Sequence, residues 1–449
     1  MPRFLLIGLC AFLIGCSQTS DLKRPDAPVP QAWSAPDIEL TPHDAAKTHW
    51  RNYFADPRLQ SLITQALENN RDLKIAAARV VEARALYGVT KAEGLPSLSL
   101  GATAGASLTM IEAPLAVVSY ELDFWGRLAG LSDSARFSFL ATEEARRAVR
   151  ISLVADVASA YFTLLQLDAM AELSQATADA REQSLELLTK GRDLGGLNDF
   201  EVQQAAGILE MAKSALADVQ YQRVAVKNRL DYLVGKVAVM QTPGYALEEQ
   251  DLDLALAPGL PSEVLLVRPD VMASEQRLRA AHANIGVART AFFPKIALVA
   301  GFGVASQGLA SLLSGSTTSF SPRFSLPALF DGGRTAAGVE VAEARKSIAL
   351  AEYERTIQLA FREVSDQLAA RASLVAQMRS ANVNKASQER RLQIAWARHN
   401  AGMVGYLEVL DAQRELFAAQ QAALQVRRAQ LESAVQLYKA LGGGEQRAD

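Results

Sequence analysis

The chain is an internal tandem repeat, and this duplication restricts its fold more than any other feature of the sequence. Arg71-Asp72-Leu73 matches Pro269-Asp270-Val271, 198 positions later, and Gly126-Arg127 matches Gly333-Arg334, 207 positions later. Residues 235–262 separate the halves, and three prolines and an acidic stretch there interrupt any regular pattern. A repeat of this length predicts that each structural element occurs twice.

Each half begins with a predicted helix of about twenty residues that stops before a proline. These helices cover Asp72–Lys91 and Asp270–Ala291, where Ala and Arg are frequent. After the proline the composition changes to Gly, Ser, Thr and β-branched or aromatic residues, over 96–126 and 294–330. This change predicts one β-hairpin per half and therefore four strands per chain.

The rest of each half predicts helices of unusual length. No proline occurs from Ser132 to Gly191 or from Thr335 to His399, and apolar residues recur there at alternating spacings of four and three. About sixty helical residues span about 90 Å, three times the hydrocarbon thickness of a bilayer. Glycine-containing turns lead into returning helices at Asp199–Leu233 and Tyr406–Leu441. Each half therefore predicts a long helical hairpin.

Four strands cannot form a membrane barrel alone. In lipid, an open sheet edge leaves backbone groups unpaired at several kcal/mol each, and the smallest membrane barrels have eight strands. If the chain spans a membrane, we expect it to oligomerise, and three copies would supply twelve strands. The alternative from pattern alone is a soluble periplasmic coiled coil whose Gly/Ser segments are loops.

The N-terminus predicts export and lipid attachment. The apolar run Phe4–Cys16 follows one basic residue, Arg3, and is too short to cross about 30 Å of hydrocarbon as a helix. It ends in Leu13-Ile14-Gly15-Cys16, which is similar to a lipobox, so Cys16 is predicted to be acylated and to begin the mature chain. Ser17 in place of Asp favours the outer membrane. An ordinary secretory signal with a chance cysteine is the alternative.

Composition and motifs argue against several classes of function. Forty-six basic and 49 acidic residues leave a net charge of -3, which provides no basic surface for nucleic acid. Two cysteines and four separated histidines provide no cluster of metal ligands. Neither a P-loop nor a nucleophile–base set occurs. We therefore expect a non-enzyme without metal or cofactor, apart from the covalent lipid on Cys16.

Seven segments between Trp50 and Gly444 together resemble one protein family in order and spacing. They are Tyr53–Leu59, Tyr120–Arg127, Arg268–Val271, Ala283–Gly286, Ala291–Pro294, Leu407–Arg414 and Leu437–Gly444. The chain is similar to the outer-membrane factors of tripartite export systems, the TolC-like family, and within it to the lipoprotein efflux subgroup. The resemblance implies an α+β membrane protein. Its homotrimeric twelve-stranded β-barrel, with four strands per chain, would be continuous with a long periplasmic α-helical tunnel.

The resemblance also implies a division of the chain. Its parts are a signal peptide (1–15), an acylated N-terminal segment and waist domain (16–57), repeat 1 (58–234), a linker in the waist domain (235–262), repeat 2 (263–441) and a C-terminal tail (442–449). The first hairpin is shorter than in most relatives. We therefore expect its outer loop to be reduced to a turn near Leu108–Pro114.

Two carboxylates near the second helical tip are candidates for a channel gate. Glu408 and Asp411 are three residues apart, on one face of a predicted helix that starts just after Gly402. By resemblance, three copies place six carboxylates around the periplasmic end of the tunnel, where they favour cations, and Leu407 and Leu410 add an apolar plug. The alternative is a solvated helix face with acids near a helix N-terminus.

The hairpin tips themselves are candidates for partner binding. By resemblance, Leu194-Gly195-Gly196 and Ala401-Gly402-Met403 meet a periplasmic adaptor protein, although glycines at these positions also serve as ordinary helix stops. Glu201 and His399 occupy positions where relatives hold the closed state by hydrogen bonds between hairpins, and a plain surface role is the alternative. The aromatic residues near the inner ends of the strands, proposed as an interfacial girdle, are Tyr120, Phe124, Trp125 and Phe330. Ordinary core packing is the alternative for them.

The resemblance implies an outer-membrane channel that exports small toxic compounds. Its partners would be two further copies of the chain, the adaptor, a proton-driven inner-membrane pump and outer-membrane lipid. The outer-membrane component of type I protein secretion is the alternative within transport. A non-conducting structural lipoprotein is the alternative outside transport.

The lipobox generates the first testable prediction. Cys16→Ala should abolish lipid labelling while export is retained, because one acyl chain binds membranes only marginally whereas a barrel holds the protein in the bilayer. Mass spectrometry of the mature N-terminus measures the modification. A mature chain without lipid would show the prediction to be wrong.

Overall fold

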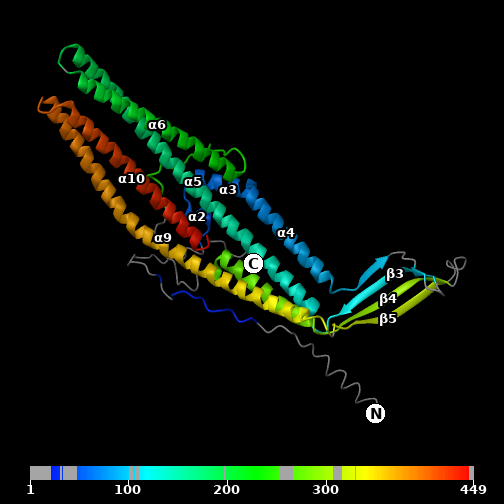
Figure 1. The fold of residues 1–449 in the computed structure, drawn as a ribbon. Coiled ribbons are helices and arrows are strands. Elements are labelled where there is room, and N and C mark those ends of the chain that lie inside the picture. The colour runs from blue at the N-terminus through cyan, green and yellow to red at the C-terminus, as the bar shows by residue number, and fades with distance from the viewer. Residues whose placement is uncertain are drawn as a thin grey trace. The chain divides into compact units, whose positions relative to one another are not determined.

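The computed structural model describes residues 22–30, 33, 48–100, 105–106, 111–196, 198–252, 266–306, 316–328 and 330–443 (Figure 1). Cys16 and the end of the linker lie outside these ranges. The chain forms two compact units, each built from segments of both sequence repeats. One unit comprises Met1–Pro28, Ala76–Arg146 and Pro269–Ile357, and the other comprises Val29–Ile75, Arg147–Arg268 and Gln358–Asp449.

The described helices agree closely with those predicted from the sequence, except that α2 and α3 were not predicted. They are α2 (Trp50–Tyr53), α3 (Pro57–Asn69), α4 (Arg71–Ala92), α5 (Arg127–Asp193), α6 (Asp199–Val234), α8 (Pro269–Thr290), α9 (Arg334–Asn400) and α10 (Tyr406–Ala440). Helices α5 and α9 each contain 67 residues, which corresponds to about 100 Å at 1.5 Å per residue. Each forms a hairpin with the helix that follows it, so the two predicted helical hairpins are confirmed.

The strands form one antiparallel sheet from both repeats. They are β1 (Ser97–Leu100), β2 (Gly105–Ala106), β3 (Ile111–Leu122), β4 (Lys295–Ser306) and β5 (Ser316–Ser325). The order is β1-β3-β4-β5, and β2 also pairs with β3. β1 and β2 therefore occupy one strand position beside β3, and the sheet has the four predicted strand positions. The pairing of β3 with β4 joins the two hairpins.

The expected turn near Leu108–Pro114 is wrong for residues 111–114. Ile111 to Pro114 belong to β3 and pair with Ser306 to Gly303 of β4, while residues 108–110 lie outside the described ranges. The register shifts between Pro114 and Ala116. A proline has no N–H to donate to a sheet ladder, so a bulge at this point lets the strand continue.

The second unit has a core that joins the N-terminal segment, the linker and the helical hairpins. The rings of Tyr53 and Tyr438 stack with centroids 4.6 Å apart. Asp56, which caps α3, is buried and accepts hydrogen bonds from Tyr161 Oη (2.7 Å) and Gln250 Nε2 (2.6 Å). These contacts bring together the segments that the sequence assigns to a waist domain. Burial and the Asp56 carboxylate raise the pKa of Tyr161 above its ordinary value.

One described helix, α5, passes a length-and-hydropathy test for a membrane span. Its most apolar eighteen-residue window has a mean hydropathy of 1.5, and 61% of that window is buried within the protein. Residues of α5 such as Val157, Tyr161 and Phe162 are fully buried in the core of the second unit. Packing within the protein therefore accounts for the apolar character of this stretch.

Candidate functional site

Strand register gives the sheet an apolar face. Residues that pair directly across strands share a face, so Leu98, Val118, Ala300 and Phe320 form one lateral row. Alternate positions along the strands continue this face, on which Thr318 also lies. Its other members are Leu100, Ala116, Tyr120, Leu122, Ile296, Leu298, Phe302, Pro322 and Phe324.

The opposite face carries small and polar residues. Ser97, Ser119, Val299 and Ser321 form one of its rows, in which Ser97 Oγ and Ser119 Oγ are 2.9 Å apart. Its other members are Ser99, Val117, Glu121, Lys295, Ala297, Gly301, Ser319, Arg323 and Ser325. Membrane barrels alternate a lipid-facing apolar residue with a lumen-facing polar one in this way. The sheet thus has the two faces of a barrel wall.

Both outer strands of the sheet have an unpaired edge. In the described part of the sheet β1 and β2 pair only with β3, and β5 pairs only with β4 (Figure 1). β3, β4 and β5 contain 12, 12 and 10 residues, which suits strands that cross a bilayer with a tilt. In a membrane both edges must find partner strands.

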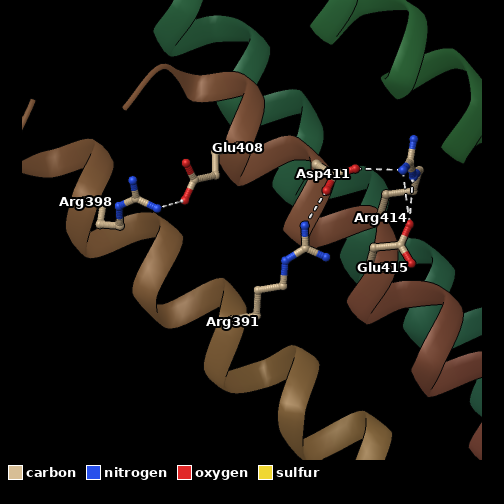
Figure 2. A network of polar contacts seen from close by, with 6 residues as sticks. All are labelled: Arg391, Arg398, Glu408, Asp411, Arg414 and Glu415. Carbon is tan, nitrogen blue, oxygen red and sulfur yellow. Dashed lines mark hydrogen bonds and ion pairs between the residues drawn. The ribbon is translucent and has the colours of Figure 1, made fainter. Parts of the chain in front are cut away.

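A cluster of six charged residues lies near the tip of the α9–α10 hairpin (Figure 2). Arg398 Nη1 donates to Glu408 Oε1 (2.6 Å), and Arg391 Nη2 donates to Asp411 Oδ2 (2.5 Å). Arg414 Nη2 donates to Asp411 Oδ1 (2.7 Å) and to Glu415 Oε1 (3.1 Å). The members of this tip charge cluster are Arg391, Arg398, Glu408, Asp411, Arg414 and Glu415.

The tip charge cluster changes the expected electrostatics of the candidate gate. Glu408 and Asp411 lie on α10 as predicted, but each has an arginine partner in its own chain. Three cations and three carboxylates make the cluster formally neutral within one chain. The expected cation-favouring ring of acids is therefore offset, and Coulomb attraction instead holds α9 against α10. Both carboxylates are partly exposed, so each pair contributes at most about 1 kcal/mol.

The sequence reasoning missed the arginines, although two signals could have located them. Arg414 follows Asp411 by three residues, so both lie on one helix face. Arg398 and Arg391 lie before the turn at Gly402 at about the distance that Glu408 and Asp411 lie after it. Residues placed symmetrically about a turn meet across an antiparallel hairpin.

The two helical hairpins pack against each other near their tips. The buried apolar residues of this contact are Leu188, Val202, Ala205, Ala395, Tyr406, Val409, Leu410 and Ala412. Leu410 is only 4% exposed, whereas Leu407 is 51% exposed. The expectation that Leu410 contributes to an apolar plug is wrong for this structure, because its side chain is enclosed between the hairpins. Leu407 alone of the pair faces outward.

The two tip turns are built alike and leave apolar side chains exposed. Gly195 and Gly402 have φ values of 78° and 69°, in the left-handed region that side chains disfavour. Gly402 N donates to His399 O (2.9 Å), which closes the end of α9. Leu194 and Met403 are 87% and 70% exposed. The glycines are therefore turn residues, and the neighbouring apolar side chains form the available surface.

The residues expected to hold a closed state occupy different environments. His399 Nδ1 lies 3.2 Å from Val404 O, and its ring packs edge-on against Tyr406 with centroids 5.4 Å apart, so its contacts are within its own hairpin. Burial raises the pKa of Tyr406. Glu201 Oε1 lies 3.9 Å from the position of a Cβ added to Gly405. Glu201 therefore lies near the other hairpin, and its role in holding a closed state stays a prediction.

The aromatic residues proposed as a girdle differ in how far they are packed, and their interfacial role stays a prediction. Trp125 stacks on Phe293 with centroids 4.6 Å apart, and its Nε1 donates to Pro294 O (2.9 Å). Phe330 is almost fully exposed, and Phe124 is partly exposed. Phe324, which the sequence reasoning did not select, is exposed on the apolar face.

Comparison with known proteins identifies the family. The family model for outer membrane efflux proteins matches residues 62–236 and 260–443. The cation efflux system protein CusC of Escherichia coli O6:H1 is 39% identical over 448 residues, which cover 97% of each chain. The chain belongs to the outer membrane efflux protein family.

Two further relatives extend this relationship. The toluene efflux pump outer membrane protein TtgF of Pseudomonas putida is 38% identical over 468 residues, covering 98% of this chain and 97% of its own. A crystal structure of the open state of the MtrE outer membrane channel of Neisseria gonorrhoeae is similar with a TM-score of 0.88 and 32% identity. The similarity covers 96% of this chain and 98% of that one. The fold of this efflux protein is therefore that of an outer membrane channel.

The different exposure of the two leucines generates a prediction. Leu410→Ala should open a cavity between the hairpins and destabilise their packing at the tips by about 2–5 kcal/mol. The loosened tips should then be cleaved faster by protease. Leu407→Ala is the matched control and should change little, since its side chain is already exposed. The rates of limited proteolysis at the tips measure the difference. Equal cleavage rates in the two variants would contradict the assignment of Leu410 to the tip core.

Proposed function

We propose that three copies of this outer membrane efflux protein form one channel of a tripartite pump, which exports small toxic compounds. The observation that carries the proposal is a sheet with one apolar face, one polar face and two open edges. Such a sheet is unstable in lipid until the edges pair. Pairing β5 of one copy with β1 and β2 of the next closes a ring of twelve strand positions.

The long helical hairpins complete the channel. Each copy contributes two, so three copies supply twelve long helices that surround one axis and continue the lumen through the periplasm. Small residues and apolar residues at coiled-coil spacing support lateral packing of such helices. A purely structural lipoprotein would have no need for a sheet with these two faces and open edges.

The names of the relatives support the proposed substrate class. CusC is named for cation efflux and TtgF for toluene efflux. These substrates share small size and toxicity, so we favour efflux over type I protein secretion. A channel of this kind does not act as an enzyme. Energy comes from a proton-driven inner-membrane pump, and that pump selects the compounds.

Three contacts with partners complete the proposal. Cys16 carries the lipid that adds a second attachment to the outer membrane. The exposed tip surface around Leu194 and Met403 meets the periplasmic adaptor. The tip charge cluster, together with Leu407, lines the periplasmic entrance and holds it closed until its ion pairs exchange partners.

The assembly and its conductance are tested together. Purified protein in detergent should have the mass of three chains and should conduct ions in a planar bilayer, and deletion of the gene should sensitise cells to small toxic compounds without loss of secreted proteins. A stable monomer or the absence of conductance would refute the channel. Loss of protein secretion with unchanged sensitivity would favour type I secretion.

The tip charge cluster gives a prediction about ion selectivity. Glu408→Gln with Asp411→Asn should make the entrance anion-selective, because the three arginines of each chain would exceed the remaining Glu415 by two charges. The reciprocal variant, Arg391→Gln with Arg398→Gln, should favour cations and serves as the matched control. Reversal potentials in a salt gradient measure both. Identical selectivity in both variants would place the cluster away from the conduction path.

The tip surface gives a separate prediction about the adaptor. Leu194→Glu with Met403→Glu should leave trimer assembly and conductance intact, because both side chains are exposed and lie outside the left-handed turn positions. Crosslinking to the adaptor and export of toxic compounds should both fall. Met403→Leu keeps an apolar surface and should behave like the natural protein. Normal crosslinking in the glutamate variant would show that the adaptor binds elsewhere.

A further inference from the structure

The charged residues of the described strands are concentrated at one end of the sheet. Glu121 is near the end of β3, just before α5, and Lys295 is the first residue of β4, just after α8. Arg323 is near the end of β5. Glu112, by its position in β3, lies toward the other end. Glu121 pairs with Ala297, and Ala297 pairs with Arg323, so these positions share the polar face. Lys295 is two residues from Ala297 and lies on the same face.

The single carboxylate of this group is neutralised by a fourth residue. Arg127, at the start of α5, binds Glu121 in bidentate geometry, with Nε to Oε1 and Nη2 to Oε2 both at 2.8 Å. This geometry is the strongest that an arginine and a carboxylate form. Two neighbouring acids, Asp123 and Asp331, accept backbone N–H groups at the starts of α5 and α9. Glu121 is thus paired with Arg127, and Asp123 and Asp331 serve as helix caps.

Lys295 and Arg323 have no such partner. Both are exposed, and within the described part of the chain neither side chain makes a hydrogen bond or ion pair with another residue. Because Lys295 pairs with Ser325 and Ala297 with Arg323, the two cations are diagonal neighbours on adjacent strands. Such positions are about 7–8 Å apart. Like charges at that separation repel each other, so a mobile anion between them would be stabilising.

We propose that Lys295 and Arg323 form a cationic collar at the helix end of the barrel lumen, which attracts multivalent anions and favours the passage of anionic solutes. The collar rests on the proposed trimer, in which three copies place six cations around the axis. It is distinct from the tip charge cluster, since its cations have no ion-pair partner among the described residues whereas that cluster is neutral. The channel would then have two separate electrostatic zones along its length.

Channel recordings test the collar. The variant Lys295→Gln/Arg323→Gln should lower the chloride-to-potassium permeability ratio at least about two-fold at roughly 0.01 M salt, where the Debye length is about 30 Å. The difference should nearly vanish at about 1 M salt, where the length is about 3 Å. Tripolyphosphate should block the natural channel and lose potency against the variant. Lys23→Gln/Lys236→Gln, which removes two exposed cations outside the strands, is the matched control.

The outcomes separate the collar from the channel itself. No conductance in the natural protein would refute the proposed function. Normal conductance with unchanged selectivity and unchanged tripolyphosphate block would overturn the collar alone. If the glutamine variant fails to assemble while Lys295→Arg/Arg323→Lys assembles, the charge-retaining variant must keep the tripolyphosphate block of the natural channel. A charge-retaining channel without that block would also overturn the collar.

Discussion

Every backbone group in a membrane must find a hydrogen-bond partner within protein, and this constraint governs the whole structure. One copy of the chain supplies four strand positions with open edges at β1, β2 and β5. The cost of several kcal/mol for each unpaired group in lipid makes a single inserted copy untenable. The amphipathic faces of the sheet, the duplication and the long helical hairpins are all consistent with one arrangement, in which the sheet is one part of a closed barrel.

The two repeats share a scaffold but not their charges. Glu201 and Glu408 occupy equivalent positions in the two repeats. Glu201 lies near Gly405 of the other hairpin, whereas Glu408 belongs to the tip charge cluster. The positions equivalent to Arg391, Arg398 and Asp411 are Ser184, Gly191 and Gln204. The first repeat therefore cannot build a second tip charge cluster. The tip of the first hairpin instead carries the ion pairs of Arg192 with Asp193 and Asp199. In a trimer the tip charge cluster would therefore occur three times around the axis rather than six.

The sequence predicts the fold well because its signals are local and repeated. The absence of proline, the spacing of apolar residues and the glycine turns place α5, α6, α9 and α10 within a few residues of their observed ends. The failures depend on contacts between distant residues. Nothing local distinguishes Leu407 from Leu410, because only packing against the other hairpin buries one of them. The pairing of Arg391 with Asp411 likewise requires the register of the hairpin, and the continuation of β3 through Pro114 depends on a bulge.

The pairing of β3 with β4 also has a consequence for how the chain folds. Leu122 at the end of β3 and Ile296 in β4 are direct partners, yet the helices α5, α6 and α8 separate them in sequence. Contacts of such sequence separation form slowly, because the entropy of closing a large loop is lost before the pairing stabilises anything. The helical hairpin of the first repeat can form early, whereas the sheet cannot be completed until the second repeat has been synthesised. Membrane insertion is therefore expected to be a late event, and the exposed strands of the first repeat need protection from aggregation until then.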